Sequence, residues 1–342
     1  METDKPYEPY IGEIIMEYQV VAFIRYHHGI LMFKVEHVKS KFPYLLKMID
    51  VSASTPNKVT MFINEIRILS SIDHPLFFEY VESFVELDKQ LICAIYQYER
   101  SININEIMFR LSYNGQHTDH SNMINYLVHA AFIGRELDKR RVEMLEMDPK
   151  NLYQNQNTEF KLGSCLKFFI PNMKVKDVGT ISSDNVTAPE LITKGSYGIM
   201  TNVWHFGYVG YLMSSLKFNF QRAKSTEMKK LSEFFYKVLE KSKIRVLFKG
   251  AIFDTIWVMM QPAPELRASW SEILQTADFR EAVEAVEAKY PGLLKRTLEK
   301  EKLPLKPLIN LEGDLLSIHE QLISVYGQKL DSKGWPVKPK YQ

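Results

Sequence analysis

The chain has 342 residues, of which 46% are hydrophobic and 25% are charged, and its formal net charge is +2. This composition excludes fibrous and disordered proteins, because a disordered chain lacks the apolar side chains that build a core. The length predicts two lobes or two small domains, and the nearly neutral charge gives no strong attraction for nucleic acid or an anionic membrane.

Cysteine content and the length of the apolar runs exclude further classes of protein. Only Cys93 and Cys165 are present, and two cysteines build neither a disulfide framework nor a zinc site of four thiolates. The first residues, METDKPYE, lack the apolar region of a signal peptide, and no stretch approaches the roughly 20 apolar residues of a membrane-spanning helix. We therefore expect a soluble, cytoplasmic protein that does not contact membranes.

The first predicted elements are strands. Short β-rich runs occupy residues 18–24, 30–35 and 44–49, and polar turns separate them, which predicts an antiparallel meander. At residues 59–72 the apolar residues recur at helical spacing. Two more β-like runs follow at 77–84 and 90–96, and the pattern is then mostly helical to about residue 280.

These elements predict a small β-rich lobe followed by a larger helical lobe. The predicted divisions are an N-terminal extension, the two lobes and a C-terminal tail, at residues 1–17, 18–97, 98–280 and 281–342. The polar residues 98–121 are expected to include the connection between the lobes. In the tail, an Ala/Glu/Lys-rich helix is expected at 280–289 and an amphipathic helix at 311–326, so residues 308–342 are interpreted as a docking arm for another protein.

Taken in chain order, a series of short motifs resembles the landmarks of protein kinases, closest to the cyclic-AMP-dependent Ser/Thr kinase group. The motifs are Leu46-Lys47, NEIRIL at 64–69, DHP at 73–75, MDPKNL at 147–152, KLGSCL at 161–166, APEL at 188–191, NVWHFG at 202–207 and PAPELR at 262–267. The resemblance implies an α+β, bilobal protein kinase-like fold, with a small β-rich N-lobe that carries the αC helix and a larger, mainly helical C-lobe.

The resemblance places the ATP-binding residues of the N-lobe at positions that are only partly kept. The glycine-rich phosphate loop becomes Ile24, Tyr26 and Gly29, and bulky side chains at two of these positions keep the backbone away from a triphosphate. Lys47 and Glu65 match the kinase ion pair. We interpret this pair as a lobe-stabilising ion pair rather than a phosphate-binding group. Leu45 replaces the small residue above the adenine, so adenine is expected to fit poorly.

The catalytic residues of the C-lobe are changed more severely. The aspartate that accepts the substrate proton becomes Glu146, one methylene longer, and the catalytic lysine becomes Asp148, with the opposite charge. Asn151 is kept, but Ser164 replaces the aspartate that holds magnesium, and a neutral hydroxyl is a poor Mg²⁺ ligand. Leu145 replaces the arginine that would bind a phosphorylated activation segment.

The structural residues of the fold are kept. Glu190 and Arg267 match a buried kinase ion pair, and Asn202 replaces the aspartate that anchors the catalytic loop, where it is still able to accept a hydrogen bond. A further set matches the hydrophobic stack that crosses the lobes of active kinases and is interpreted as ordinary core: Leu69, Leu91, Met144 and Cys165.

Other patterns carry no separate chemistry. The histidine pairs at 27–28 and at 117 and 120 lack a third ligand, so no metal site is expected. The basic runs at 139–141 and 295–296 have acidic neighbours, and we interpret them as solvated surface rather than a nucleic-acid contact.

The sequence therefore favours a catalytically inactive kinase-like protein, a pseudokinase, that acts as an interaction or scaffolding module without a cofactor. Two alternatives stay open. One is an unconventional kinase of low activity that uses Glu146, Asp148 and Asn151, and the other is a metal-independent nucleotide sensor. The expected partners are proteins, and association with a cytoskeletal or ciliary assembly is a further hypothesis beside the cytoplasmic location.

Overall fold

The computed structural model describes residues 7–145, 147–165, 168–169, 188–190, 198–215, 248–261, 263–300 and 302–303. The chain divides into two compact units, and each is described here by itself. Of the described residues, the first unit contains 7–71 and 79–99, and the second contains 72–78 and those from 100 to 303.

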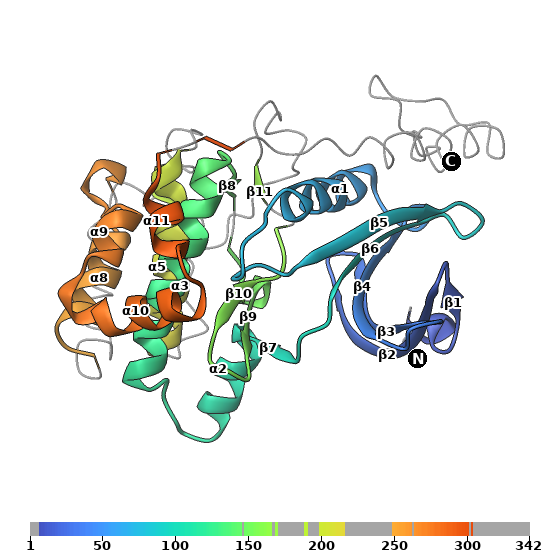
Figure 1. Ribbon diagram of the computed structural model, residues 1–342, viewed down its shortest axis with the longest axis horizontal. Coiled ribbons are helices and arrows are strands. Elements are labelled where there is room, and N and C mark those ends of the chain that lie inside the picture. The colour runs from blue at the N-terminus through green and yellow to red at the C-terminus, as the bar shows by residue number, and fades with distance from the viewer. Residues whose placement is uncertain are drawn as a thin grey trace, which may run out of the picture. The chain divides into compact units, whose positions relative to one another are not determined.

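The first unit is a curled antiparallel sheet with one long helix (Figure 1). The strand order is β1-β2-β3-β4-β6-β5, and α1 packs against β5. The elements are β1 (Ile14–Ile15), β2 (Tyr18–His27), β3 (Ile30–His37), β4 (Pro43–Asp50), α1 (Pro56–Ser70), β5 (Tyr80–Glu86) and β6 (Leu91–Gln97).

The register of β4 gives the sheet two different faces. Leu46 and Met48 belong to an apolar cluster with residues of β2, β3 and β6. Lys47 lies between them and pairs with Met32 on β3 and Ala94 on β6. Because neighbouring side chains of a strand point to opposite faces, the lysine is on the face away from this cluster.

The chain before β2 takes part in this apolar cluster. The Tyr7 ring stacks on Phe23 with 3.9 Å between ring centroids, and the Tyr10 ring meets Phe33 edge-on at 6.0 Å. Ile15 of β1 is fully buried. The described part of the predicted N-terminal extension is therefore part of the first unit.

Helix α1 follows from its apolar spacing. It starts at Pro56, whose fixed φ suits a first helical position, and it buries Val59, Phe62, Ile66 and Leu69. Glu65 lies on this buried side as well. The sequence thus places one carboxylate among apolar residues, and it needs a cationic partner there.

The second unit is mainly helical, with short strands (Figure 1). Helix α3 contacts α5, α9, α10 and α11, and β10, β9 and β7 form a small sheet. The elements are β7 (Ser101–Asn103), α2 (Ile104–Tyr113), α3 (His120–Lys139), β8 (Glu143–Met144), β9 (Leu152–Asn155), β10 (Phe160–Leu162), β11 (Phe168–Phe169), α5 (Ile199–Ser215), α8 (Ala251–Met259), α9 (Trp270–Leu274), α10 (Arg280–Lys289) and α11 (Leu293–Leu298).

Close helix packing in this unit depends on two glycines. A Cβ on Gly134 of α3 would lie 2.2 Å from the Trp270 ring, and a Cβ on Gly207 of α5 would lie 2.8 Å from the Met259 Cβ. Neither distance leaves room for a methyl group. These glycines allow α9 to approach α3 and α8 to approach α5.

The α+β, kinase-like fold class predicted from the sequence is confirmed, with a curled N-terminal sheet and a helical C-terminal unit. The predicted strand at 77–84 differs, because β5 begins at Tyr80. Phe77 and Phe78 instead pair with Leu162 in the second unit. Across the residues that the structure describes, no helix combines the length and apolar character needed to cross a bilayer.

Candidate functional site

Lys47 and Glu65 form a buried ion pair in the first unit. The Lys47 Nζ donates to Glu65 Oε1 at 2.6 Å, and both side chains are 1% exposed. The pair connects β4 to α1, as the sequence predicts. An ion pair this deeply buried is held by its mutual charge, and either member alone would be a costly buried charge.

Two further residues cover the lysine side of the sheet. Tyr96 of β6 is fully buried, and the Lys47 Nζ lies 4.9 Å from the centre of its ring. Leu45 is directly opposite Tyr96 in the β4–β6 pairing, and it too is buried. Leu45 was predicted from the sequence, whereas Tyr96 was not. The alternation of β6 would have revealed it, because Tyr96 is two residues beyond Ala94, the partner of Lys47.

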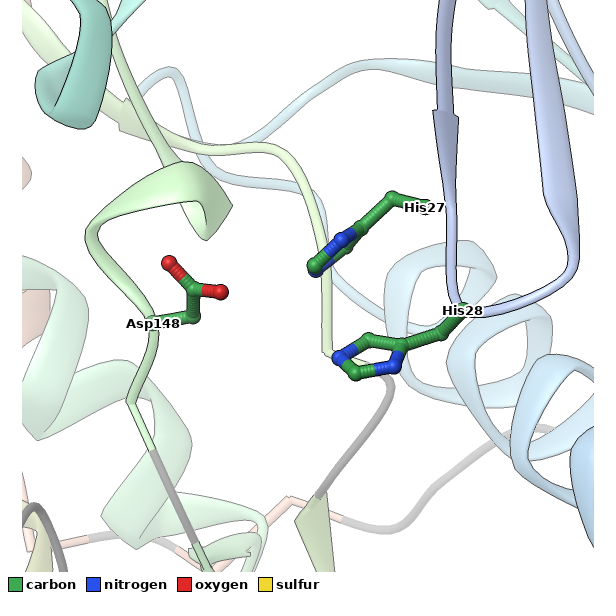
Figure 2. Close-up of side chains that lie close together, drawn as sticks. All are labelled: His27, His28 and Asp148. Atoms are coloured by element: carbon green, nitrogen blue, oxygen red, sulfur yellow. The ribbon is translucent and has the colours of Figure 1, made fainter. Parts of the chain in front are cut away.

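The expected phosphate loop is a tight hairpin. Ile24 and Tyr26 lie within β2 and are 42% and 51% exposed, whereas Gly29 lies in the two-residue turn to β3. His28 and Gly29 both have positive φ, 52° and 92°, which is typical of a type I′ hairpin turn. Figure 2 shows His27 at the end of β2 and His28 in this turn. Of the three glycines of the kinase phosphate loop, this chain has only Gly29.

In the second unit, Asn202 of α5 anchors the chain around β8. The Met144 N–H donates to Asn202 Oδ1 at 2.8 Å, and the Asn202 Nδ2 donates to the Val142 carbonyl at 2.9 Å. The predicted anchoring role of Asn202 is confirmed. Glu146, expected at the position of the catalytic base, lies outside the described residues.

A buried carboxylate holds Asn202 in turn. Asp138 accepts from Asn202 Nδ2 at 2.9 Å and from the Trp270 indole N–H at 2.7 Å. Burial raises the pKa of Asp138 to about 8, although both hydrogen bonds act in the opposite direction. This link between α3, α5 and α9 was not predicted, because Asp138, Asn202 and Trp270 are far apart in sequence.

Asp148 precedes a short 3₁₀ turn, η2 (Pro149–Asn151), and Asn151 is its last residue. Asp148 Oδ1 accepts from the Lys150 N–H at 2.8 Å, so this carboxylate caps the turn. Figure 2 shows its position in the loop before η2. Asn151 is buried, and its Oδ1 has no hydrogen-bond partner among the described residues. This orphaned amide oxygen is the kind of group that water or a cation would satisfy.

The expected metal-binding turn lacks a carboxylate. Ser164 and Cys165 are buried, and the Gly163 N–H donates to the Asn151 carbonyl at 2.9 Å. The turn therefore lies beside Asn151. Its donor set does not fit a magnesium-bound triphosphate, because Ser164 offers a neutral hydroxyl where Mg²⁺ requires a carboxylate.

The second predicted ion pair is confirmed. Arg267 donates to both Glu190 oxygens at 2.7 Å, and Thr201 donates to Glu190 Oε1 at 2.9 Å. Burial alone would raise the pKa of Glu190, but the hydrogen bonds and charge of Arg267 lower it. The carboxylate is therefore ionised at neutral pH, and it ties residues 188–190 to the segment that precedes α9.

One surface prediction is wrong. The basic run 139–141 was expected to be solvated, yet Lys139 is 4% and Arg140 is 7% exposed, and only Arg141 is exposed as expected. Lys139 donates to the Arg296 carbonyl at the end of α11, which explains its burial. The members of the expected hydrophobic stack are all fully buried, each within its own unit: Leu69, Leu91, Met144 and Cys165.

Comparison with known proteins finds distant kinase relatives. The chain is 22% identical over 260 residues to the Serine/threonine-protein kinase Nek7 of Arabidopsis thaliana, covering 75% of this chain and 44% of the relative. It is also 22% identical to Nek3 of Oryza sativa subsp. japonica, covering 70% and 40%, and to Nek11 of Homo sapiens, covering 76% and 39%. No family model matches the chain.

These similarities support a protein kinase-like fold. The chain spans less than half the length of these three relatives. The three relatives are Nek kinases, so the resemblance to the cyclic-AMP-dependent group stays a prediction.

Proposed function

We propose that this chain is a kinase-like protein that does not transfer phosphoryl groups and that acts by binding other proteins. The observation that carries the proposal is Ser164, a hydroxyl at the position where a kinase needs its metal-binding carboxylate. Phosphoryl transfer depends on positioning and on neutralising the phosphate charge, so the loss of the metal site removes the main source of catalysis.

A second group of residues supports the same conclusion from the first unit. Lys47 is engaged by Glu65 and lies against the Tyr96 ring, and Leu45 extends the apolar cover. A lysine that binds phosphate has to present its ammonium to the ligand. Here the buried pair serves to join β4 and α1, which is the structural role that the sequence favours.

A phosphoryl-transfer and nucleotide-binding experiment tests the proposal. The full chain is incubated with radiolabelled ATP and either Mg²⁺ or Mn²⁺, and its melting temperature is measured with nucleotide in the presence and absence of EDTA. We expect no label transfer and no nucleotide-dependent rise in melting temperature. The matched control is Asn151→Ala. Transfer that this substitution abolishes would establish an unconventional kinase, and a shift that persists in EDTA would establish a nucleotide sensor.

The partner-binding role is assigned to residues 308–342, which lie outside the described residues. What supports it is the amphipathic pattern at 311–326, in a segment where Pro304 and Pro307 precede the pattern. Affinity purification of the full chain and of a chain ending at residue 307, with mass spectrometry of the bound proteins, tests the assignment. Partners retained by the shorter chain would count against it.

A further inference from the structure

Arg140 at the end of α3 is a buried cation with most of its donors unused. Its Nη2 lies 3.0 Å from Glu136 Oε1, and both side chains are less than 9% exposed. The Nε and Nη1 atoms are buried, and they have no hydrogen-bond partner among the described residues. Three N–H groups on these two atoms therefore need an acceptor, since a buried guanidinium donor without one is strongly destabilising.

His74, in the same unit, adds another donor of this kind. The Leu76 N–H donates to His74 Nδ1 at 3.2 Å, so Nδ1 carries a lone pair and the ring proton of the neutral histidine is on Nε2. Nε2 is buried and has no partner among the described residues. The hydrogen bond to Nδ1 thus fixes the tautomer and leaves a buried N–H that also lacks an acceptor.

The charges around His74 are mainly positive. Burial, followed by the charges of Arg296, Arg140 and Lys139, lowers the pKa of His74 to about 3. Among the acidic residues, Glu136 bonds to Arg140, and the charges of exposed Asp73 and exposed Glu299 act on Arg140 and Lys139, respectively. The Lys139 ammonium is already bonded to a carbonyl, so the unused groups are all donors in a positive field.

We propose that Arg140 and His74 bind a small free oxyanion, such as inorganic phosphate or sulfate, at the end of α3. An oxyanion supplies several acceptor oxygens and a negative charge, whereas water supplies acceptors without charge. Arg140 and His74 are each 7% exposed, so the site favours a free anion over a phosphate attached to a peptide. Exposed Arg296 adds a further positive charge that acts on His74.

Thermal unfolding of the full chain tests this site. Sodium phosphate, sodium sulfate and a phosphoserine peptide are each titrated against sodium chloride at matched ionic strength. We expect phosphate or sulfate to raise the melting temperature by about 2 °C at ten times the dissociation constant. No rise beyond chloride would overturn the proposal, and a rise with the peptide alone would overturn the free-anion assignment.

Two variants localise the effect. Arg140→Met removes the guanidinium donors, and the control Arg141→Met changes the neighbouring exposed arginine. His74→Asn keeps an acceptor for the Leu76 N–H but removes the Nε2 donor. We expect Arg141→Met to retain the phosphate response and both site variants to lose it. If Arg140→Met does not fold, His74→Asn decides alone, because an unchanged phosphate response in that variant would refute the site.

Discussion

At the residue scale, the structure assigns a specific task to Asp138. Its two oxygens accept only from neutral donors, Asn202 and Trp270, among the hydrogen bonds described for it. Arg135, whose positive charge favours the ionised form of Asp138, donates its own N–H groups to the Thr297 and Glu299 carbonyls. The carboxyl is therefore easily protonated, and it controls how Asn202 is held.

This environment predicts a pH-dependent stability. The pKa of Asp138 is raised from 3.8 to about 8 in the folded chain, so the folded state keeps the proton that the unfolded state has lost. Stability from this group is present below pH 4 and is lost as the pH rises to about 8, by at most about 1.4 kcal/mol per pH unit. Urea unfolding followed by tryptophan fluorescence measures it.

The matched variant for this measurement is Asp138→Asn, which cannot titrate. The unfolding free energy of the original chain minus that of the variant is expected to fall from pH 6 to pH 8 and then to level off, because only the original chain loses stability as Asp138 ionises. Equal slopes in both proteins would show that Asp138 is not the titrating group.

At the element scale, the Glu190–Arg267 pair joins segments that are far apart in sequence. Arg267 also donates to the Gln261 and Met200 carbonyls, so a single side chain connects residues 188–190, the start of α5 and the segment after α8. The pair is buried and bidentate, so the two charges compensate each other.

Removing one partner should therefore be costly. Arg267→Met leaves Glu190 buried without its counter-charge and is expected to lower the unfolding free energy by about 3–5 kcal/mol. The exposed Arg280→Met is the control and should change it by less than about 0.5 kcal/mol. Adding Glu190→Gln to Arg267→Met should recover part of the loss in a urea titration. No recovery in the double variant would show that the charge is not the cause.

Elements with a long run of regular apolar pattern were predictable from the sequence, and elements that depend on partners far along the chain were not. Alternation, helical spacing and short apolar runs bounded by polar turns found β2, β3, β4, β6 and α1 to within a few residues. Phe77 and Phe78 belong to an apolar run that looks continuous with β5, yet their backbone pairs with Leu162. Local pattern carries no information about such a partner far along the chain.

The residues of the candidate site were likewise predictable only where a local motif contains them. Lys47 with Glu65 and Glu190 with Arg267 were found because each residue stands in a recognisable motif. Tyr96 and Asp138 were missed, because their importance comes from the residues opposite them in the fold. The burial of Arg140 was missed for a related reason. A basic run looks solvated until the structure shows which element covers it.

At the scale of the whole molecule, the second unit extends further along the chain than the helical lobe predicted from the sequence. The sequence placed the end of the helical lobe near residue 280. The structure continues the unit through α10 and α11, which contact α3. Arg135 and Lys139 donate to carbonyls at the end of α11, and the Leu303 N–H donates to the Lys139 carbonyl. These contacts stabilise a helix end whose last carbonyls have no partner within the helix.

If α11 is an integral part of the unit, its buried anchor should matter as much as any core residue. Leu293 is 1% exposed, so Leu293→Ala should lower the unfolding free energy by about 2–4 kcal/mol, through lost burial and the cavity left behind. Lys295→Ala changes an exposed residue of the same helix and is expected to be nearly neutral. Both are measured by urea unfolding. If Leu293→Ala were as mild as Lys295→Ala, α11 would be a weakly attached appendage, because a helix of six residues has little stability without the contacts that hold it.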